Sequence, residues 1–330
     1  MTRRFSRSLH DLLPRIHVAL AVCCLSVAGC SPRESPVLRM GSTIWPGFEP
    51  FYVARELHFW REDQIKLIEY TSTSELSRAF RNGTVDGGLL TLDEALLLVE
   101  HRQDIRILLV TDISNGADVI MAKPEFHSMK DLRGHRIGAE TTGLGAYVLF
   151  RALELAGLTP GDVEIVPLEF SEQQPAFDRG LVDAVVTYEP VRTQLKSSGA
   201  RQIFDSTLIP GEIVDVLVVR TSYLAASPDN ARLLVETFYR ALRYAREQSD
   251  DFVRIAAARE SETPQQFRQS MTLLHVPDAP EGPAMLAGTP SPLQRQAKSL
   301  ADLMIRKNLL LTPVDVASMF ERRPRQRDAP

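Results

Sequence analysis

The sequence predicts an α/β protein built from two similar lobes. Three observations support this. Strand-like and helix-like stretches alternate along the chain, one nine-residue pattern occurs twice, and 330 residues are too many for one small core. The composition, with 44% hydrophobic and 24% charged residues, is typical of a globular protein and excludes a disordered, collagen-like or coiled-coil chain.

The predicted strands and helices follow one another from residue 37 onwards. Helices are marked by apolar residues on one face; Val148, Ala152 and Leu153, for example, share the face of a helix that begins at Gly143 and ends before Gly157. Alternation of strands with helices favours mostly parallel sheets. The predicted strands are 37–44, 65–70, 85–90, 105–110, 119–122, 136–139, 163–167, 182–187 and 214–219. The predicted helices are 51–57, 74–81, 143–156, a segment around 234–245 and 294–307, with a Pro/Gly stretch over 277–292 before the last one.

The pattern that occurs twice indicates an internal repeat. The sequence A-F-x-x-G-x-V-D begins at Ala79 and again at Ala176, 97 positions later. In both copies a helix ends on the glycine, where a positive φ costs little, and a buried strand follows. The repeat therefore places Thr91 and Tyr188 at equivalent carboxyl ends of two strands, the edge at which open α/β sheets bind ligands.

The first 36 residues have the features of an export signal. Four arginines precede an apolar run over 16–27, about 12 residues long, which is shorter than the roughly 20 needed to span a bilayer. The run leads into Ala28-Gly29-Cys30, which resembles the lipobox of bacterial lipoproteins. We expect residues 1–29 to be a signal peptide, Cys30 to be lipidated and 30–36 to be a tether; an ordinary signal peptide with an incidental cysteine is the alternative.

Cysteine usage and charge exclude several classes of protein. All three cysteines fall within the first 30 residues, which excludes a disulfide scaffold, a cysteine-ligated metal site and a cysteine nucleophile in the body of the chain. The formal net charge of −4 gives no support for a nucleic-acid partner, which would usually require a basic face.

Five short motifs lie in order behind the lipobox. They are Trp45-Pro46-Gly47 with Pro50, Gly83-x-Val85-Asp86, Asp112-x-Ser114-x-Gly116-Ala117-Asp118, Asp131-Leu132-Arg133-Gly134, and Gly180-x-Val182-Asp183-Ala184 with Glu189-Pro190. In this order and spacing they resemble the bacterial periplasmic solute-binding proteins of the nitrate/taurine/sulfonate/thiamine-precursor group. The resemblance implies the α/β type II periplasmic binding protein fold, in which two lobes joined by a hinge close on a ligand in the cleft between them.

The resemblance also implies domain boundaries. The first part of lobe 1 would be 37–112 and lobe 2 would be 113–208. The second part of lobe 1 would be 209–330, with C-terminal helices and a basic tail over 321–330 that is expected to fray. Two crossings, near 112–118 and 204–210, would form the hinge.

Candidate ligand-binding residues lie in the loops that would face this cleft. Trp45 and Phe48 stand on a Pro/Gly turn, where an aromatic ring can stack on a flat ligand or pack in the core. Ser72 and Thr73 can donate to a ligand or cap a helix, and the turn at Gly143 offers backbone N–H groups in the other lobe. The complete expected set is Trp45, Phe48, Ser72, Thr73, Thr91, Ser114, Thr142, Gly143, Tyr188, Glu189 and Asp215.

Acidic residues outnumber basic ones in these segments. Arg192 is the basic residue there, against Asp93, Glu94, Asp112, Asp118, Glu140, Glu189 and Asp215. Because a strongly anionic ligand usually calls for an arginine fork, this balance favours a neutral, zwitterionic or amine-bearing ligand, for instance a thiamine-precursor-like pyrimidine. Nitrate, taurine or an alkanesulfonate is the alternative. We expect half or more of these acids to be helix caps or salt-bridge partners, Asp112 and Asp118 alternatively to brace the hinge, and Glu189 to be the best single polar contact.

Catalysis has little support in the sequence. The chain contains no H-E-x-x-H or H-x-H spacing for zinc and no G-x-S-x-G elbow for a serine hydrolase. We therefore expect no catalytic residue, no metal and no cofactor.

These observations together favour a binding protein outside the cytoplasm. We expect a monomeric lipoprotein on the periplasmic side of a bacterial membrane that captures a small organic molecule and delivers it to an ABC permease and its ATPase. The alternative is a sensory subunit whose closure is detected by a membrane receptor kinase or cyclase. Ser31 after Cys30 resembles the outer-membrane sorting pattern, but the sequence leaves the inner or outer membrane undecided.

Overall fold

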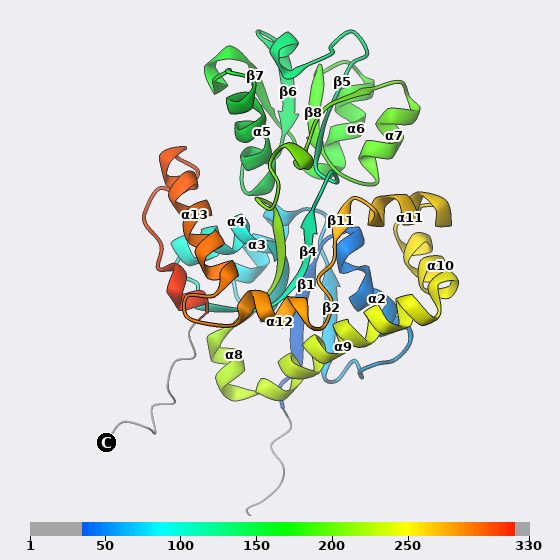
Figure 1. Ribbon diagram of the computed structural model, residues 1–330, viewed down its shortest axis with the longest axis vertical. Coiled ribbons are helices and arrows are strands. Elements are labelled where there is room, and N and C mark those ends of the chain that lie inside the picture. Colours follow the sequence, from blue (N-terminus) through cyan, green and yellow to red (C-terminus); the bar gives the residue numbers. More distant parts are fainter. Residues whose placement is uncertain (1–34, 321–330) are drawn as a thin grey trace, which may run out of the picture. The chain divides into compact units, whose positions relative to one another are not determined.

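The computed structural model describes residues 35–320, so the predicted signal peptide, Cys30 and the C-terminal tail lie outside the described residues. From residue 37 onwards the chain forms two mixed sheets with helices packed against them (Figure 1). The six-stranded sheet consists, in spatial order, of β11 (Leu274–His275), β4 (Ile105–Ser114), β10 (Val214–Arg220), β3 (Gly87–Thr91), β1 (Leu38–Ser42) and β2 (Ile65–Glu69). The five-stranded sheet consists of β7 (Glu164–Pro167), β6 (Arg136–Ala139), β8 (Ala184–Thr187), β5 (Val119–Ala122) and β9 (Arg201–Asp205).

The helices divide between the two sheets. The helices of the six-stranded part are α2 (Glu49–Glu56), α3 (Thr73–Arg81), α4 (Leu92–Glu100), α8 (Thr221–Ala226), α9 (Pro228–Glu247), α10 (Ser249–Arg259), α11 (Pro264–Met271), α12 (Glu281–Leu286) and α13 (Pro292–Arg306). The helices of the five-stranded part are α5 (Leu144–Leu155), α6 (Phe170–Asp178) and α7 (Val191–Ser197). Short 3-10 turns are η1 (Pro46–Phe48), η2 (Met129–Leu132), η3 (Pro160–Asp162), η4 (Ser206–Leu208) and η5 (Val316–Met319).

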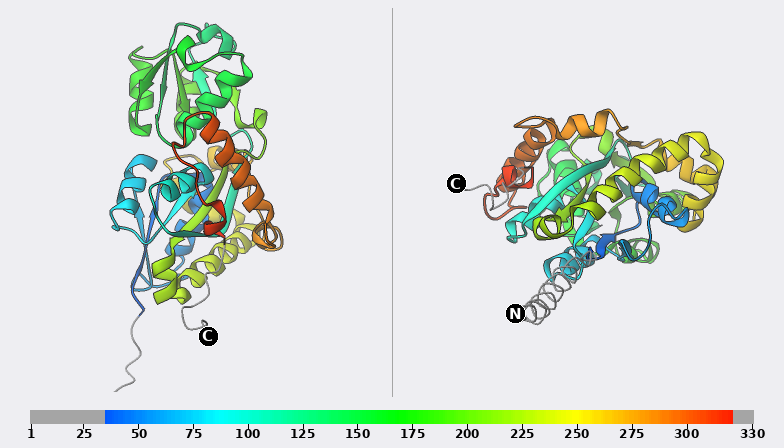
Figure 2. Two further views of the ribbon diagram at one scale, coloured as in Figure 1. Left: turned by 90° about the vertical axis from the view of Figure 1, so that its left-hand side faces the viewer. Right: turned by 90° about the horizontal axis from the view of Figure 1, so that it is seen from below.

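Strand β10 shows why helices cover both faces of the six-stranded sheet. Successive side chains of a strand point to opposite faces. Val216 and Val218 join the apolar cluster that includes α4 and α13, whereas Leu217 and Val219 join the cluster that includes α2 and α9. All four are buried, so an uninterrupted apolar strand requires helices on both sides, as Figure 2 shows.

The prediction of mostly parallel sheets is wrong. Of the nine strand pairings, four are parallel and five antiparallel. Strands β4 and β5 carry the chain out of the six-stranded sheet, and β9 and β10 carry it back. A returning strand runs opposite to the strands beside it, so β10 is antiparallel to both β3 and β4.

The predicted strands and helices are otherwise present, with boundaries that differ by a few residues. The sequence analysis did not identify α4, α7, α8, α10, α11, α12, β9 or β11, and of α6 it predicted only the end, before Gly180. Helix α4 has six apolar residues among nine, spread over most of its faces, so it lacks the alternation of faces that marks an amphipathic helix. Helix α6 contains Pro175, a residue that normally argues against a helix interior.

The two copies of the repeated pattern fold alike. Gly83 after α3 has φ +73° and Gly180 after α6 has φ +70°, the left-handed conformation that glycine adopts at little cost. Each copy then places its aspartate beside an arginine of the neighbouring strand. Asp86 accepts from the backbone N and the guanidinium of Arg39, and Asp183 accepts from the same groups of Arg136.

The two crossings between the sheets lie side by side. Ser114 Oγ and Ser206 Oγ are 2.7 Å apart, and the backbone N of Gly116 donates to Ser206 Oγ at 2.6 Å. The backbone N of Ser206 also donates to the Asp118 carbonyl at 2.9 Å. These bonds join the segments predicted to form a hinge; the hinge itself stays a prediction.

We expect the Asp183→Asn variant to lower the free energy of unfolding at neutral pH by about 2 kcal/mol, because the partly buried donors of Arg136 and Lys123 lose a charged acceptor. Burial disfavours the Asp183 charge, yet hydrogen bonds from Arg136 and Lys123 hold the pKa of this carboxyl well below its ordinary value. A lowered pKa contributes stability above the unfolded value, and this contribution is lost as the pH falls through the folded value. Urea unfolding at neutral and acidic pH measures both effects.

The matched control is Asp178→Asn, an exposed aspartate five positions earlier in the chain. It should change the free energy of unfolding by less than about 0.5 kcal/mol. Equal effects of the two substitutions would contradict the assigned role of Asp183.

Candidate functional site

A pocket lies where the carboxyl ends of strands from both sheets meet. It holds about 560 Å³ of space not occupied by atoms, open solvent included, and we call it the inner pocket. Strands β3 and β8, the equivalent strands of the repeat, contribute Thr91 and Thr187 at their ends, and Tyr188 follows directly. The inner pocket is lined by Thr43, Ile44, Trp45, Phe48, Thr73, Leu89, Leu90, Thr91, Glu94, Asp118, Glu140, Leu144, Gly145, Val148, Val186, Thr187, Tyr188 and Asp215.

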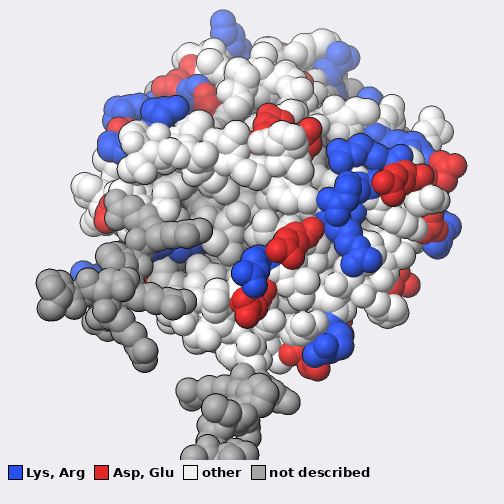
Figure 3. Space-filling model, turned by 60° about the horizontal axis from the view of Figure 1, so that its bottom comes forward, with Lys and Arg blue, Asp and Glu red and all other residues white. Residues whose placement is uncertain are grey.

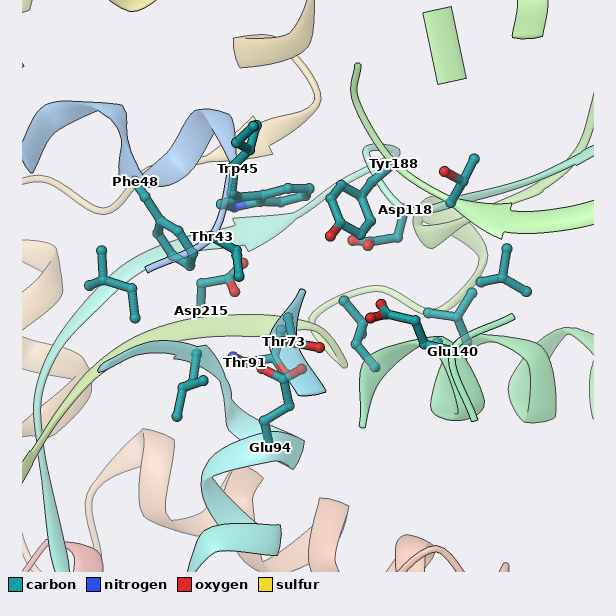
Figure 4. A pocket seen from close by; sticks show the side chains of 18 residues that line it. Thr43, Trp45, Phe48, Thr73, Thr91, Glu94, Asp118, Glu140, Tyr188 and Asp215 are labelled. Carbon is teal, nitrogen blue, oxygen red and sulfur yellow. Dashed lines mark hydrogen bonds between the residues drawn. The ribbon is translucent and has the colours of Figure 1, made fainter. Parts of the chain in front are cut away.

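Aromatic side chains form one wall of the inner pocket (Figure 4). The rings of Trp45 and Tyr188 meet edge to face with centroids 5.5 Å apart. Tyr188 also stacks on Phe170, with centroids 4.2 Å apart and planes 8° from parallel. Such pairs hold rings at defined angles, so a flat or cationic ligand group would meet a wall that is already ordered.

The Trp45-Pro46-Gly47 turn is held by a buried carboxylate. Trp45 Nε1 donates to Asp112 Oδ1 at 3.1 Å. A Cβ on Gly47 would lie 1.9 Å from Asp112 Oδ2 and 2.8 Å from Trp45 Nε1, so no larger residue fits there without displacing the bond. This close approach explains why a glycine stands between Pro46 and Phe48.

Four carboxyl groups point into the inner pocket, those of Glu94, Asp118, Glu140 and Asp215 (Figure 4). Each residue is 6% exposed or less, and each keeps one oxygen without a hydrogen-bond partner: Glu94 Oε1, Asp118 Oδ2, Glu140 Oε1 and Asp215 Oδ2. Within residues 35–320, no lysine, arginine or histidine lines this pocket. Buried carboxylates without a positive partner are costly, so the inner pocket strongly favours a positive charge.

The burial of these groups raises their pKa values. Burial raises the pKa of Asp118 to about 7 and that of Glu140 to about 7. It also raises the pKa of Glu94, and the neighbouring charge of Asp93 raises it further. The pKa of Asp215 lies well above its ordinary value because the group is buried and faces Asp112 across β10 and β4. Near neutral pH these carboxyl groups therefore hold protons that a cation could replace.

A second, larger hollow opens next to the inner pocket. This outer pocket has about 1200 Å³ of space, open solvent included, and shares Thr73, Glu94 and Glu140 with the inner pocket. Its other lining residues include Arg78 and Arg81 at the end of α3. The two pockets therefore adjoin one another.

Six of the eleven residues predicted to bind ligand line the inner pocket. They are Trp45, Phe48, Thr73, Thr91, Tyr188 and Asp215. Thr142 and Gly143 line the outer pocket instead. Ser72 caps α3 by accepting from the backbone N of Glu75, and Ser114 is bonded to Ser206 in the crossing. Whether any of the predicted residues contacts a ligand stays a prediction.

Glu189, the preferred single candidate, lies outside the inner pocket. It is 2% exposed and its carboxylate accepts from Arg192 Nη1 at 2.9 Å and from the backbone N and Oγ1 of Thr193, both at 3.0 Å. The carboxylate therefore binds the first turn of α7 and neutralises Arg192. Because both oxygens of this carboxylate already accept hydrogen bonds, we do not retain Glu189 as a candidate for ligand contact.

The structure adds three acids to the candidate set: Glu94, Asp118 and Glu140. The sequence analysis placed them in or near the cleft but did not select them. Glu94 and Glu140 follow β3 and β6, and Asp118 precedes β5. Acids at strand ends were therefore a usable signal, but the sequence did not show which of them lacked a partner.

Two features of the described part of the chain concern metal binding and membrane crossing. Across the described residues 35–320, no group of three or more His, Cys, Asp or Glu has an arrangement that could hold a metal ion. In the same part of the chain, no helix combines the length and apolar character needed to cross a bilayer.

The surface carries both signs of charge. Acidic and basic side chains lie beside one another on the face drawn in Figure 3. Some exposed residues of opposite charge form ion pairs, for example Arg232–Asp229 and Arg254–Asp251.

Comparison with known proteins gives consistent matches. The model of the NMT1-like family matches residues 31–259. The taurine-binding periplasmic protein of Escherichia coli (strain K12) is 26% identical over 164 residues, covering 49% of this chain and 51% of that protein. The putative aliphatic sulfonates-binding protein of the same organism is 25% identical over 170 residues, covering 51% of each. The chain thus spans about half the length of the curated relatives it matches.

The fold matches solved structures over most of its length. The alkanesulfonate-binding protein SsuA from Xanthomonas axonopodis pv. citri, bound to MOPS, aligns with a TM-score of 0.73 at 18% identity, covering 86% of this chain and 97% of that one. This similarity confirms the predicted fold class, an α/β periplasmic binding protein fold.

We expect the stability of the unliganded protein to fall as the pH rises from about 5.5 to about 8.5, by about 2 kcal/mol for Asp118 alone. Its folded pKa of about 7 lies above that of the unfolded chain, so its stabilising contribution is present at low pH and is lost as the pH rises through the folded value. Glu94, Glu140 and Asp215 act in the same direction. Chemical denaturation across this pH range measures the slope.

The Asp118→Asn variant should have a shallower slope and be more stable than the wild type at about pH 8.5, because it carries no charge to bury. Glu125→Gln, a substitution at an exposed acid outside both pockets, is the control and should leave the slope unchanged. A slope unaffected by Asp118→Asn would contradict the raised pKa of this group.

Proposed function

This chain belongs to the NMT1-like family, and we propose that it is an extracytoplasmic solute-binding protein that delivers a small, amine-bearing organic molecule to an ABC permease. Its similarity to a taurine-binding periplasmic protein and to a putative aliphatic sulfonates-binding protein supports the binding and import part of this proposal. The pocket chemistry supports the ligand part.

One observation carries the choice of ligand. Four buried carboxyl groups with free oxygens, those of Glu94, Asp118, Glu140 and Asp215, converge on a pocket whose described lining has no basic side chain. A protonated amine supplies both the charge and the N–H donors that these oxygens lack. The Trp45 and Tyr188 rings would add cation–π attraction.

The same chemistry disfavours nitrate and sulfonates. A sulfonate brings a full negative charge and needs donors, preferably an arginine fork. Arg192, the basic residue predicted nearest to the cleft, is bonded to Glu189 and Gln202. A sulfonate in the inner pocket would lie among four acids with no cation to compensate, so we propose a ligand that differs from those named for the relatives.

The ligand would be captured when two lobes, each built around one of the sheets, close on it. We propose that the parts over 37–112 with 209–330 and over 113–208 act as lobes, and that the bonded crossings at Ser114 and Ser206 act as the hinge. The inner pocket is lined by residues from both sheets, so a ligand held there would link the lobes. Uptake of the labelled ligand by cells with and without this chain tests delivery to a permease.

We expect amines and aminopyrimidines, and not nitrate, taurine or alkanesulfonates, to raise the melting temperature of a lipid-free form that begins at Ser31. A ligand at about 100 times its Kd adds about 2.7 kcal/mol to the free energy of unfolding, which a thermal unfolding scan detects. Asp118→Asn should reduce the shift, because the variant loses a charged acceptor, whereas Glu125→Gln should not. Stabilisation by sulfonates or nitrate instead would overturn the amine proposal and leave the fold unaffected.

We also propose that Cys30 carries the lipid that holds the protein at the membrane. In cells, Cys30→Ser should abolish incorporation of radiolabelled palmitate and release the protein into the soluble periplasmic fraction, because the lipid supplies the membrane affinity. Cys24→Ser, within the predicted signal peptide, should leave both unchanged. Persistent labelling of the Cys30→Ser protein would refute lipidation at this residue.

A further inference from the structure

We propose that the ligand carries two positively charged nitrogen atoms, one bound by Asp118 and Asp215 within the inner pocket and one by Glu94 and Glu140 where the inner pocket meets the outer pocket. This inference rests on the proposed function, because it specifies which class of amine the same site binds. It follows from how the carboxyl groups are distributed and from how many of them lack partners.

The four acids fall into two pairs by the pockets they line. Asp118 and Asp215 line the inner pocket alone, whereas Glu94 and Glu140 line both pockets. All four are close enough to interact, since the charges of Asp118 and Glu94 both contribute to the raised pKa of Asp215 and the charge of Glu140 contributes to that of Glu94. Figure 4 shows all four carboxyl groups around the same space.

A single ammonium group cannot satisfy this arrangement. It brings one charge and three N–H donors, but four buried carboxyl oxygens lack partners. Thr187 Oγ1, a buried hydroxyl that lines the same pocket, also lacks one. A second ammonium at the other pair would supply donors for the remaining oxygens and neutralise a second carboxylate, so two charges fit the site better than one.

The surfaces around the two pairs fit an organic spacer. Asp118 and Asp215, which we call the inner pair, line the same pocket as the rings of Trp45 and Tyr188. Aromatic rings attract a cation to their faces. Leu90, Val148 and Val186 also line the inner pocket and offer apolar contact to the carbon atoms that would connect the nitrogens.

The charges of the outer pocket differ from one side to the other. Arg78 and Arg81 at the end of α3 line it, whereas Glu169 and Glu172 line it at the start of α6. Because like charges repel, a second nitrogen is favoured at the edge that the two pockets share and disfavoured at the end of α3.

Isothermal titration calorimetry with matched pairs of amines tests the proposal. The pairs are putrescine and butylamine, cadaverine and pentylamine, and p-xylylenediamine and p-methylbenzylamine, measured at about pH 8, where more of the acids are ionised. In at least one pair, the diamine should bind about 10- to 100-fold more tightly than the monoamine, as expected for one added charge-assisted contact.

The Glu140→Gln variant tests which pair binds the second nitrogen. It should lower the affinity for the diamine by about 10- to 100-fold and the affinity for the monoamine by clearly less, since the monoamine would use Asp118 and Asp215. Glu94→Gln should have the same effect on the two affinities, and it replaces Glu140→Gln in the test if that variant does not fold. Glu125→Gln is the control and should alter neither affinity.

The outcomes separate this inference from the proposed function. Equal affinities within every pair, or a Glu140→Gln variant that weakens both members equally, would overturn the two-charge ligand while amine binding stands. A panel in which no diamine binds would also overturn it. Binding of a sulfonate or of an uncharged solute with no binding of any amine would overturn the proposed function as well.

Discussion

The energetic cost of burying unpaired carboxyl groups is the constraint on which the rest of the site depends. Glu94, Asp118, Glu140 and Asp215 are each 6% exposed or less, and each keeps an oxygen without a partner. Carboxyl groups buried in this way must hold protons or have a compensating charge beside them. The raised pKa values of these groups and the preference for a cationic ligand have this single cause.

The scaffold brings these acids together through a repeated structural unit. In each half, a helix ends at a glycine with positive φ, and the next strand begins beside an aspartate bonded to an arginine of the neighbouring strand, Arg39–Asp86 and Arg136–Asp183. The two strands so positioned end at Thr91 and Thr187, and both residues line the inner pocket. The fold therefore sets the place of the site, whereas a few side chains set its charge.

This separation explains how the chain can share a fold with SsuA while the chemistry of its pocket is set by its own side chains. The structural match to SsuA covers most of both chains, but at 18% identity it concerns the arrangement of strands and helices. Specificity depends on which charges face the cleft and on which of those are already neutralised. Arg192, the basic residue that the sequence analysis placed near the cleft, is paired with Glu189. The acids that line the inner pocket therefore determine its charge.

The sequence by itself determined the fold class, most strands, the internal repeat and the excess of acid near the cleft, because apolar periodicity, glycine at helix ends and motif order are local properties. It could not distinguish Glu189 from Asp118, since both are acids beside a strand end. The tertiary structure alone decided between them. Glu189 is satisfied by Arg192 and Thr193, whereas Asp118 keeps a buried oxygen free. Whether a charge has a partner depends on contacts that folding creates, and these contacts leave no pattern along the chain.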